Sequence, residues 1–347
     1  MVFSPKGATS IDLVTRDLLR TGGYGEGGFA IGRAVENPFD DVDFRAINSD
    51  RKGSILESVA SLIRDEKPDA VVVHQHPESA AKLAKMLPST PVILHRHGLL
   101  RHKKGLLSNW RKGRQFSTLA GIIFVSGFLR QRFIESYPQF ISKSHVVWNG
   151  IDTDFWRPNE SKEQTIAFVG RARKDKGIGE LIAAFRALNM PDWDLHLGLA
   201  VQTAEERFYA DKILSDTGAN PNIKASLNLT SVEVRDLLAR SAIAALPSIV
   251  EEGFHRAVIE AMACGCVTIA TNRGGTPEAA GEAGILLPDV DAHELVKSLS
   301  TTLRTIVIDQ ALAKKYEKLS RTHASLNSNL HSASSKHLKV LKEILQQ

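Results

Sequence analysis

The sequence has few cysteines and no long stretch without charge. Cys264 and Cys266 are its only cysteines, too few for a disulfide framework, and further ligands for a zinc site are lacking at the usual spacings. Its longest segment without Asp, Glu, Lys or Arg is 115–129, whereas a membrane-spanning helix needs about 18 apolar residues or more. The first residues lack the basic and apolar regions of a signal peptide. We therefore expect a cytoplasmic protein without a membrane span, whose two thiols are buried and reduced.

Acidic residues are scarce in the first part of the chain. Residues 1–150 carry 21 Lys and Arg against 14 Asp and Glu, a balance of +7, whereas residues 151–347 carry 23 against 25, a balance of −2. This asymmetry predicts that the first part faces an anionic partner. No nucleic-acid recognition motif accompanies the basic residues, so we expect no nucleic-acid binding.

Short apolar runs alternate with amphipathic helical patterns from end to end. This alternation predicts parallel sheets with helices on both faces. Two helix starts carry capping boxes, Ser54 with Glu57 and Thr230 with Glu233. The expected strands are 70–74, 92–94, 121–125, 145–148, 166–169, 194–198, 242–246, 267–270 and 284–287.

A domain boundary is predicted shortly after the turn signal Asn149-Gly150. The segment 157–164 has the polar composition of a linker. We expect an α/β protein of two doubly wound, Rossmann-like domains, residues 1–155 and 156–331, that face each other across a cleft. The apolar stripe of the last helix, 332–347, is expected to pack on the first domain.

A strand followed by a basic turn is predicted at Phe168-Val-Gly-Arg-Ala-Arg-Lys-Asp-Lys-Gly177. Gly170 ends the strand, and Arg171 and Lys176 follow at its carboxyl end, where parallel sheets bind their ligands. A guanidinium can hold two phosphate oxygens and an ammonium supplies a point charge, so this turn is suited to a pyrophosphate. Taken alone, the segment would equally be a solvent-exposed basic loop.

Glu252 and Glu260 stand eight residues apart in Glu251-Glu-Gly-Phe-His-Arg-Ala-Val-Ile-Glu260. Along one helix they would be separated by up to about 12 Å. That spacing suits a sugar nucleotide, whose hexose and ribose hydroxyls lie on opposite sides of a pyrophosphate. A helix start near His255–Ala257 would direct N–H groups toward the phosphates. An acidic first helical turn is the alternative interpretation.

A glycine turn, Asn272-Arg-Gly-Gly-Thr-Pro-Glu278, follows the strand at 267–270 and has amides that could bind an anion. In this order and spacing, the three motifs resemble those of the retaining family 4 glycosyltransferases (glycosyl transferases group 1), which have the GT-B architecture. The resemblance covers roughly residues 91–288. It implies transfer of a hexosyl group from a UDP- or GDP-sugar to a hydroxyl of a glycan or glycolipid, in lipopolysaccharide or surface-polysaccharide synthesis. It also implies retention of configuration and no metal or other cofactor.

The resemblance assigns roles to individual residues. Glu252 would hold the donor hexose, Glu260 the ribose, and Arg171 and Lys176 would neutralise the leaving diphosphate. His97, in the family's His-Gly pattern, would contact the hexose near its reacting carbon. The residues expected in catalysis are His97, Arg171, Lys176 and Glu252. The residues expected to bind the donor are Gly7, Ala8, Gly170, Gly253, Phe254, His255, Ala257, Val258, Glu260, Gly275 and Thr276.

Some of these assignments have alternatives. A structural histidine is the alternative for His97, and His95 and His102 stand close to it. The donor loop at Gly7-Ala8 has a rival in the glycine-rich segment 21–28. His255 stands where the family has a small residue or proline, which leaves the donor hexose open.

Other functions on the same scaffold are a sugar-nucleotide epimerase, a phosphorylase or a non-catalytic sugar-nucleotide-binding subunit. An epimerase would act without an acceptor, and a phosphorylase would need a lysine-bound pyridoxal phosphate.

The segment Arg96–Arg114 contains seven Lys and Arg, no Asp or Glu, and interleaved leucines with Trp110. This pattern predicts peripheral association with an anionic membrane surface. An acceptor that bears phosphate or acidic sugars would suit it equally, and a solvated helix is the alternative.

Overall fold

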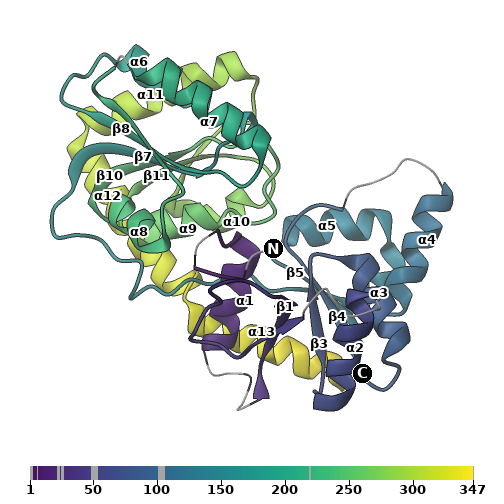
Figure 1. Ribbon diagram of the computed structural model, residues 1–347. Helices are drawn as coiled ribbons and strands as arrows, with labels where there is room; N and C mark the ends of the chain where they lie inside the picture. The colour runs from purple at the N-terminus through teal and green to yellow at the C-terminus, as the bar shows by residue number, and fades with distance from the viewer. Residues whose placement is uncertain are drawn as a thin grey trace. The chain divides into compact units, whose positions relative to one another are not determined.

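The computed structural model describes residues 3–5, 7–21, 24, 27–47, 54–100, 106–218 and 220–346, with the side chains of 106–109 left aside (Figure 1). The chain forms two compact units, which are described separately. Unit 1 comprises Met1–Gly150 and Leu330–Gln347, and unit 2 comprises Ile151–Asn329. The chain thus enters unit 2 five residues before the boundary expected between 155 and 156.

Unit 2 contains a six-stranded parallel sheet in the order β12-β11-β10-β7-β8-β9. Counted from its first strand this order is 3-2-1-4-5-6, that of a dinucleotide-binding Rossmann fold. The succession of strands changes direction between β7 and β10, which therefore flank the switch point. The strands are β7 (Glu163–Arg171), β8 (Asp194–Ala200), β9 (Ile223–Leu227), β10 (Ser241–Leu246), β11 (Val267–Thr271) and β12 (Ile285–Leu287).

Helices cover both faces of this sheet, with α6, α7 and α11 on one side and α8, α9 and α12 on the other (Figure 1). Such cover explains why the central strands β10 and β11 are almost wholly buried. The expected capping box of α8 is confirmed, because the Glu233 amide donates to Thr230 Oγ1 and the Thr230 amide to Glu233 Oε2. The helices are α6 (Ile178–Leu188), α7 (Ala204–Thr217), α8 (Ser231–Arg240), α9 (Arg256–Ala263), α10 (Thr276–Ala280), α11 (Ala292–Ile308) and α12 (Gln310–Asn327).

Unit 1 has a four-stranded parallel sheet in the order β3-β4-β5-β6 and a separate parallel pair, β1-β2. The capping box of Ser54 and Glu57 opens α2, as expected. The strands are β1 (Ala30–Arg33), β2 (Phe44–Ile47), β3 (Val71–His74), β4 (Val92–Arg96), β5 (Gly121–Phe124) and β6 (Ser144–Val146). The helices are α1 (Ser10–Arg20), α2 (Ile55–Glu66), α3 (Pro77–Met86), α4 (Leu106–Ser117), α5 (Gly127–Ser136) and α13 (Leu330–Leu345).

The C-terminal helix α13 packs on the sheet of unit 1. Its side chains Val340, Leu341 and Ile344 are buried in one cluster with Ile93 of β4, Ile123 of β5 and Val147. Burial of an aliphatic side chain contributes about 1.5–3 kcal/mol, so this seam fixes the end of the chain to unit 1. Gly121 provides the space for the Ile344 side chain, because a Cβ at position 121 would lie 2.6 Å from Ile344 Cδ1.

Two expectations, one from the scarcity of cysteine and one from the lack of long uncharged segments, agree with the structure. Cys264 and Cys266 are free and buried, and burial raises the pKa of both thiols, so they pack as small apolar side chains. Across the described part of the chain, the helices are too short or too polar to span a bilayer.

Candidate active site

Two of the motifs meet at the switch point of the unit 2 sheet. The turn after β7, which includes the short helix η3 (Lys174–Lys176), touches the loop that follows β10. The amide of Ile249 donates to the Asp175 carbonyl over 2.8 Å. Gly177 has a φ of +70°, and a Cβ there would lie 2.1 Å from the Pro247 carbonyl oxygen, so the contact requires glycine. The two loops thus meet where a doubly wound sheet binds its ligand.

Lys176 and Glu252 form an ion pair at this junction. Lys176 Nζ lies 2.5 Å from Glu252 Oε1, and Ser248 Oγ donates to the same oxygen over 2.6 Å. Each charged side chain is 17% exposed. Burial opposes ionisation of Glu252, but His255, Lys176 and Ser248 together lower its pKa to about 2. Glu252 is therefore an anion across the physiological pH range, with its acceptor oxygens held in place.

The glycine turn after β11 supports the backbone of Glu252. Gly274 has a φ of +61°, and a Cβ there would lie 2.5 Å from the Glu252 carbonyl oxygen. The amide of Gly275 donates to that oxygen over 2.7 Å. The sequence suggested that the amides of this turn are free for an anion, whereas the Gly275 amide positions Glu252.

His255 lies between Glu252 and the glycine turn. It precedes α9 as its N-cap residue and is 9% exposed. Its Nε2 is 3.9 Å from Glu252 Oε1, and its Nδ1 is 3.4 Å from Thr276 Oγ1. Burial lowers the pKa of His255 to about 4, so the ring is neutral at pH 7 and Lys176 is the cation beside Glu252. The structure therefore brings Lys176, Glu252, His255 and Thr276 together.

The other residues of unit 2 that were expected to bind the donor differ in how far they are buried. Gly170 in β7, Gly253 before α9 and Ala257 in its first turn are partly exposed. Phe254 and Val258 are buried, so their side chains belong to the core and their contribution to a site would come from the backbone.

Arg171 and Glu260 have partners of their own. Arg171 Nη2 lies 2.6 Å from Oε1 of Glu206, a carboxylate of α7 that is 2% exposed. Glu260 Oε1 accepts from Arg256 Nε over 2.7 Å within α9. The helix start expected near His255–Ala257 is confirmed, because α9 begins at Arg256. The 12 Å spacing along one helix does not apply, because Glu252 lies in the loop before α9.

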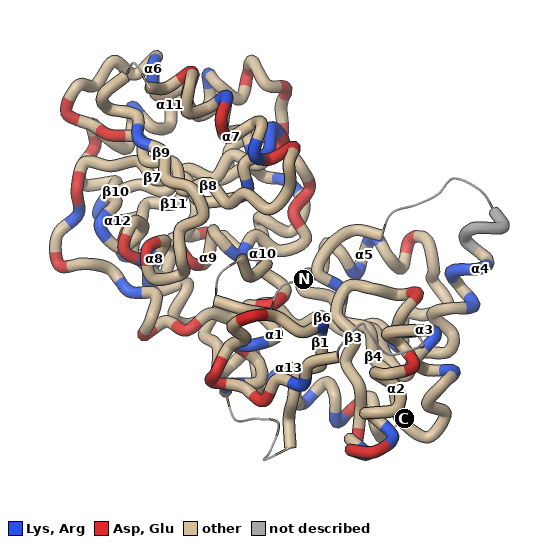
Figure 2. Tube along the Cα trace, viewed as in Figure 1, with Lys and Arg blue, Asp and Glu red and all other residues tan. Residues whose placement is uncertain are grey.

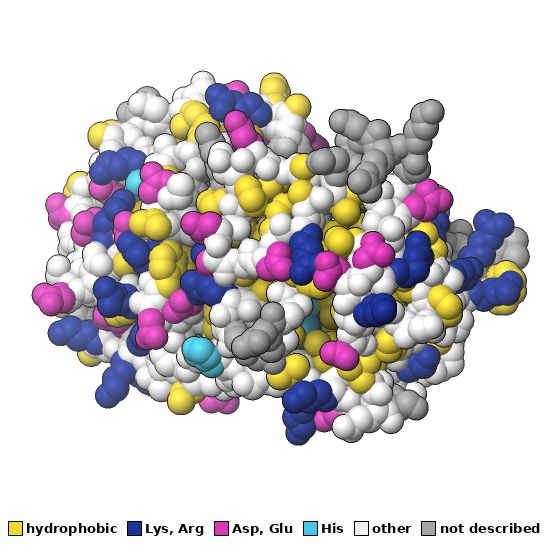
Figure 3. All heavy atoms as spheres, turned by 60° about the horizontal axis from the view of Figure 1, so that its bottom comes forward, with side chains coloured by type: hydrophobic (Ala, Val, Ile, Leu, Met, Phe, Trp, Pro, Cys, Tyr) yellow, Lys and Arg dark blue, Asp and Glu magenta, His cyan; other side chains and the backbone are white. Residues whose placement is uncertain are grey.

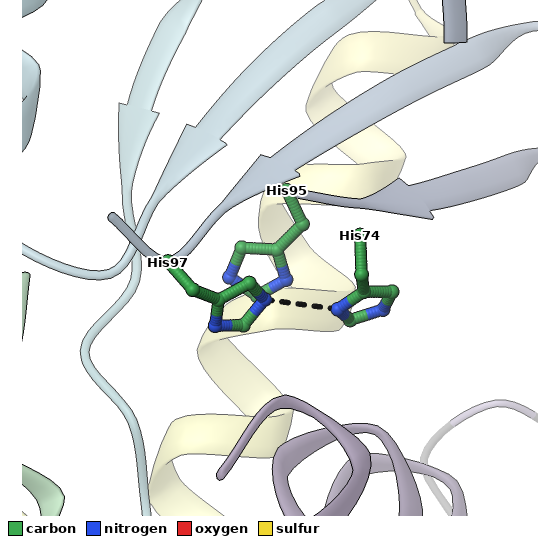
Figure 4. Close-up of side chains that lie close together, drawn as sticks. All are labelled: His74, His95 and His97. Carbon is green, nitrogen blue, oxygen red and sulfur yellow. Dashed lines mark hydrogen bonds between the residues drawn. The ribbon is translucent and has the colours of Figure 1, made fainter. Parts of the chain in front are cut away.

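The expected residues of unit 1 occupy two places. Gly7, with a φ of +87°, and Ala8 precede α1, whose N-cap residue is Thr9. His97 follows β4, its amide donates to Gln75 Oε1 over 3.0 Å, and burial lowers the pKa of its ring. Its ring belongs to a cluster with those of His74 and His95 (Figure 4).

Sequence reasoning missed His74, although a signal was present. His74 ends the expected strand 70–74 and His95 directly follows the expected strand 92–94, and the two pair directly in the register of β3 and β4. Parallel strands that end in the same residue type place those side chains at one sheet edge.

Comparisons with known proteins identify the family and the fold. The family model for glycosyl transferases group 1 matches residues 151–322, and that for glycosyltransferase family 4 matches residues 38–155. Alpha-maltose-1-phosphate synthase of Mycolicibacterium smegmatis is 29% identical over 284 residues, which are 71% of this chain and 72% of that protein. The MMP alpha-(1->4)-mannosyltransferase of Mycolicibacterium hassiacum is 31% identical over 164 residues, 46% of this chain and 39% of that protein.

Among solved structures, HepE of Anabaena in complex with UDP and glucose superposes with a TM-score of 0.79 at 16% sequence identity, over 97% of both chains. This likeness concerns the fold, which is the GT-B architecture of two Rossmann-like domains. The two family models adjoin and together span most of the chain. The chain belongs to the group 1 glycosyl transferases of glycosyltransferase family 4.

Proposed function

We propose that this glycosyltransferase moves a hexosyl group from a UDP- or GDP-sugar to a hydroxyl of a glycan or glycolipid, with retention of anomeric configuration. The observation that carries the proposal is the Lys176–Glu252 ion pair at the switch point of unit 2. It offers a cation for a diphosphate and an ionised acceptor for sugar hydroxyls at one place.

Both members of the pair keep capacity for a donor. An ammonium has three N–H donors, so Lys176 can hold Glu252 and a phosphate oxygen together. A carboxylate has about four lone-pair sites, so Glu252 can accept from hexose hydroxyls beside Lys176 and Ser248. His255 lies between Glu252 and Thr276 and would keep Glu252 in place beside the donor.

Arg171 and Glu260 complete the proposed donor site. The guanidinium of Arg171 has five donors, so pairing with Glu206 leaves it able to bind a phosphate. Glu260 would accept from ribose hydroxyls while Arg256 balances its charge. Lys176 and Arg171 then stabilise the leaving diphosphate, which is why we propose catalysis without a metal ion or other cofactor.

Glu252 serves as a hydroxyl ligand in this proposal. A carboxylate held by an ammonium and a hydroxyl is stabilised as an anion and is a weakened nucleophile. The acceptor would attack from the face that the diphosphate leaves, and a phosphate oxygen would take the acceptor proton. His97 in unit 1 is proposed to contact the hexose.

The acceptor side is proposed to lie at α4, at the inner face of a cell membrane. Arg111 and Arg114 are exposed there, Trp110 is 59% exposed, and the Arg114 guanidinium lies 4.9 Å from the centre of the Trp110 ring. Lys and Arg positions recur along α4 (Figure 2), and basic and hydrophobic side chains lie side by side at the right edge of the surface in Figure 3. Residues 101–105 of the expected basic segment lie outside the described residues.

A hollow beside α4 adds to this proposal. It has a volume of about 400 Å³ and is lined by Trp110, Arg114, Tyr137 and Phe140, among others. Aromatic walls and one cation suit the boundary between an apolar lipid and its anionic head group. We therefore propose a peripheral cytoplasmic enzyme of lipopolysaccharide or surface-polysaccharide synthesis.

A phosphorylated sugar is the second candidate acceptor. The basic face suits a phosphate as well as a membrane, and the relative from Mycolicibacterium smegmatis is named for a sugar phosphate product.

The test is a panel of UDP- and GDP-hexoses with membrane lipids or hexose 1-phosphates as acceptors. We expect acceptor-dependent release of a nucleoside diphosphate and an α-linked product from an α-linked donor, seen by NMR. Conversion of the donor sugar without acceptor would indicate an epimerase, and donor binding without turnover would indicate a binding subunit. Either result would contradict the proposed transfer.

A further inference from the structure

Three imidazole rings meet at the carboxyl edge of the unit 1 sheet. His74 ends β3, His95 lies near the end of β4, and His97 follows β4 by one residue. Their rings turn toward one another in Figure 4, with the C-terminal helix α13 behind them. One nitrogen of each ring lies within 4.8 Å of those of the other two.

The hydrogen bonding of this cluster is incomplete. His74 Nδ1 and His97 Nε2 form a hydrogen bond of 2.9 Å. His95 is 1% exposed, and within the described residues neither of its ring nitrogens has a hydrogen-bond partner. A buried polar group without a partner costs about 1–3 kcal/mol. The ring of His95, whose centre lies 4.5 Å from that of His97, therefore carries a buried lone pair that could bind a further ligand.

Other ligands fit the cluster less well. Three rings supply no permanent positive charge for an anion, and the guanidinium of Arg96 is turned to the carbonyls of Gln75, Gly98 and Leu99. A transition metal ion is the ligand that accepts lone pairs from several imidazoles at once.

We propose that His74, His95 and His97 form a site for one divalent transition metal ion such as Zn²⁺. Zn–N bonds of about 2.0–2.1 Å in a tetrahedral site hold the ligand nitrogens ~3.4 Å apart. The nitrogens of His74 and His97 already lie within that span, and a turn of the His95 ring closes the third side. The proton shared by His74 and His97 moves to the other nitrogen of its own ring, and both lone pairs then face the ion.

The ion would act as an inhibitor. Metal ligation occupies the His97 nitrogen, so the ion and the donor hexose compete for one residue. This consequence, unlike the binding itself, rests on the proposed function. Water would fill the fourth position, as it does in three-histidine zinc sites.

The experiment measures binding directly on the full chain without a polyhistidine tag. Equilibrium dialysis against Zn²⁺ should give one ion per chain, and Co²⁺ should give the visible absorption of a tetrahedral complex. His95→Phe keeps an aromatic ring in the stack and should weaken Zn²⁺ binding at least tenfold, whereas the exposed His293→Ala is the control and should bind as the wild type. His74→Gln serves as an independent second variant, with the fold of each checked by circular dichroism.

Wild type without a stoichiometric ion, or equal affinity in wild type, His95→Phe and His74→Gln, would overturn the site. If the ion binds and glycosyl transfer is measurable, Zn²⁺ should raise the apparent KM of the donor in wild type. A failure to detect any transfer would count against the proposed function and leave the binding result intact.

Discussion

Lys176 and Glu252 form an ion pair of 2.5 Å across 76 residues of sequence. The sequence assigned one residue to the diphosphate and the other to the hexose. Because they touch, Lys176 helps to keep Glu252 ionised, and each side chain holds the other in position. Neutralisation of either one should therefore change both steps, binding of the donor and departure of its phosphate.

Replacement of Lys176 tests this coupling. Lys176→Ala removes the cation from the leaving diphosphate and should lower kcat by about 100-fold or more, the usual effect of losing one transition-state contact. Ser248→Ala removes only a hydroxyl from Glu252 and is the matched control, with an expected loss below tenfold. The double variant Lys176→Ala/Glu252→Gln should lose less than the product of the single losses. Full activity of Lys176→Ala would remove this turn from the site.

The two glutamates should differ in kinetic effect. Glu260→Gln, at the ribose, should raise the KM of the donor about tenfold with little change in kcat, whereas Glu252→Gln should mainly lower kcat. Glutamine keeps the shape beside Arg256 and limits the loss of folding that an unpaired buried arginine would cause. Steady-state kinetics at a fixed acceptor concentration give kcat and the KM of the donor for both variants. Equal and negligible effects of the two substitutions would contradict the roles given to Glu252 and Glu260.

Gly177 should be irreplaceable because of its contact with Pro247. Gly177→Ala adds a Cβ at a φ of +70° and in collision with a carbonyl, and we expect a loss of about 2 kcal/mol or more in the free energy of unfolding. Gly179→Ala is the matched control, because its nearest atom would be 3.9 Å away and alanine favours a helix by about 1 kcal/mol. Urea unfolding measures the free energy of unfolding of both variants. Equal values for Gly177→Ala and Gly179→Ala would refute the contact.

His255 should make stability depend on pH. Its folded pKa of about 4 lies below its unfolded value near 6.5, so the unfolded chain binds more protons between these values. The free energy of unfolding should fall as pH falls from 6.5 to 4, by up to about 3 kcal/mol from this residue. His255→Asn should reduce that fall, and the exposed His293→Asn should not. Identical pH profiles for wild type and His255→Asn would exclude a buried neutral ring.

Membrane association should depend on α4. Neutralisation of Arg111, Lys112 and Arg114 should abolish co-sedimentation with anionic liposomes at low salt, because each charge contributes about 1 kcal/mol near such a surface. Neutralisation of three exposed lysines of α12, Lys314, Lys315 and Lys318, is the matched control. No binding of the wild type, or equal binding of both variants, would reject a membrane surface at α4.

The sequence predicted those parts of the fold and site whose signals are local. The capping boxes at Ser54 and Thr230 formed as expected, because their partners stand three residues away. The strand expected to end at Gly170 is β7, which runs one residue further, to Arg171. Strand β9 (Ile223–Leu227) was missed, since its exposed Lys224 and its serine break the apolar run.

Contacts between segments that are distant in the sequence could not be predicted from the sequence. Arg171 binds Glu206, which lies on another helix and shows no local sign of this role. The start of α9 at Arg256 agrees with the helix start expected near His255–Ala257. The contacts of Pro247, Ile249 and Glu252 that hold the preceding loop in place join distant segments and could not be predicted.

The central claim is that Lys176 and Glu252 mark the donor site. Calorimetric titration of UDP and GDP into wild type, Lys176→Ala and Gly179→Ala tests it without an acceptor. We predict that one of the two nucleotides binds to wild type and to Gly179→Ala with equal affinity, and to Lys176→Ala at least 30-fold more weakly. Equal binding to all three proteins, or no binding of either nucleotide to wild type, would contradict the account.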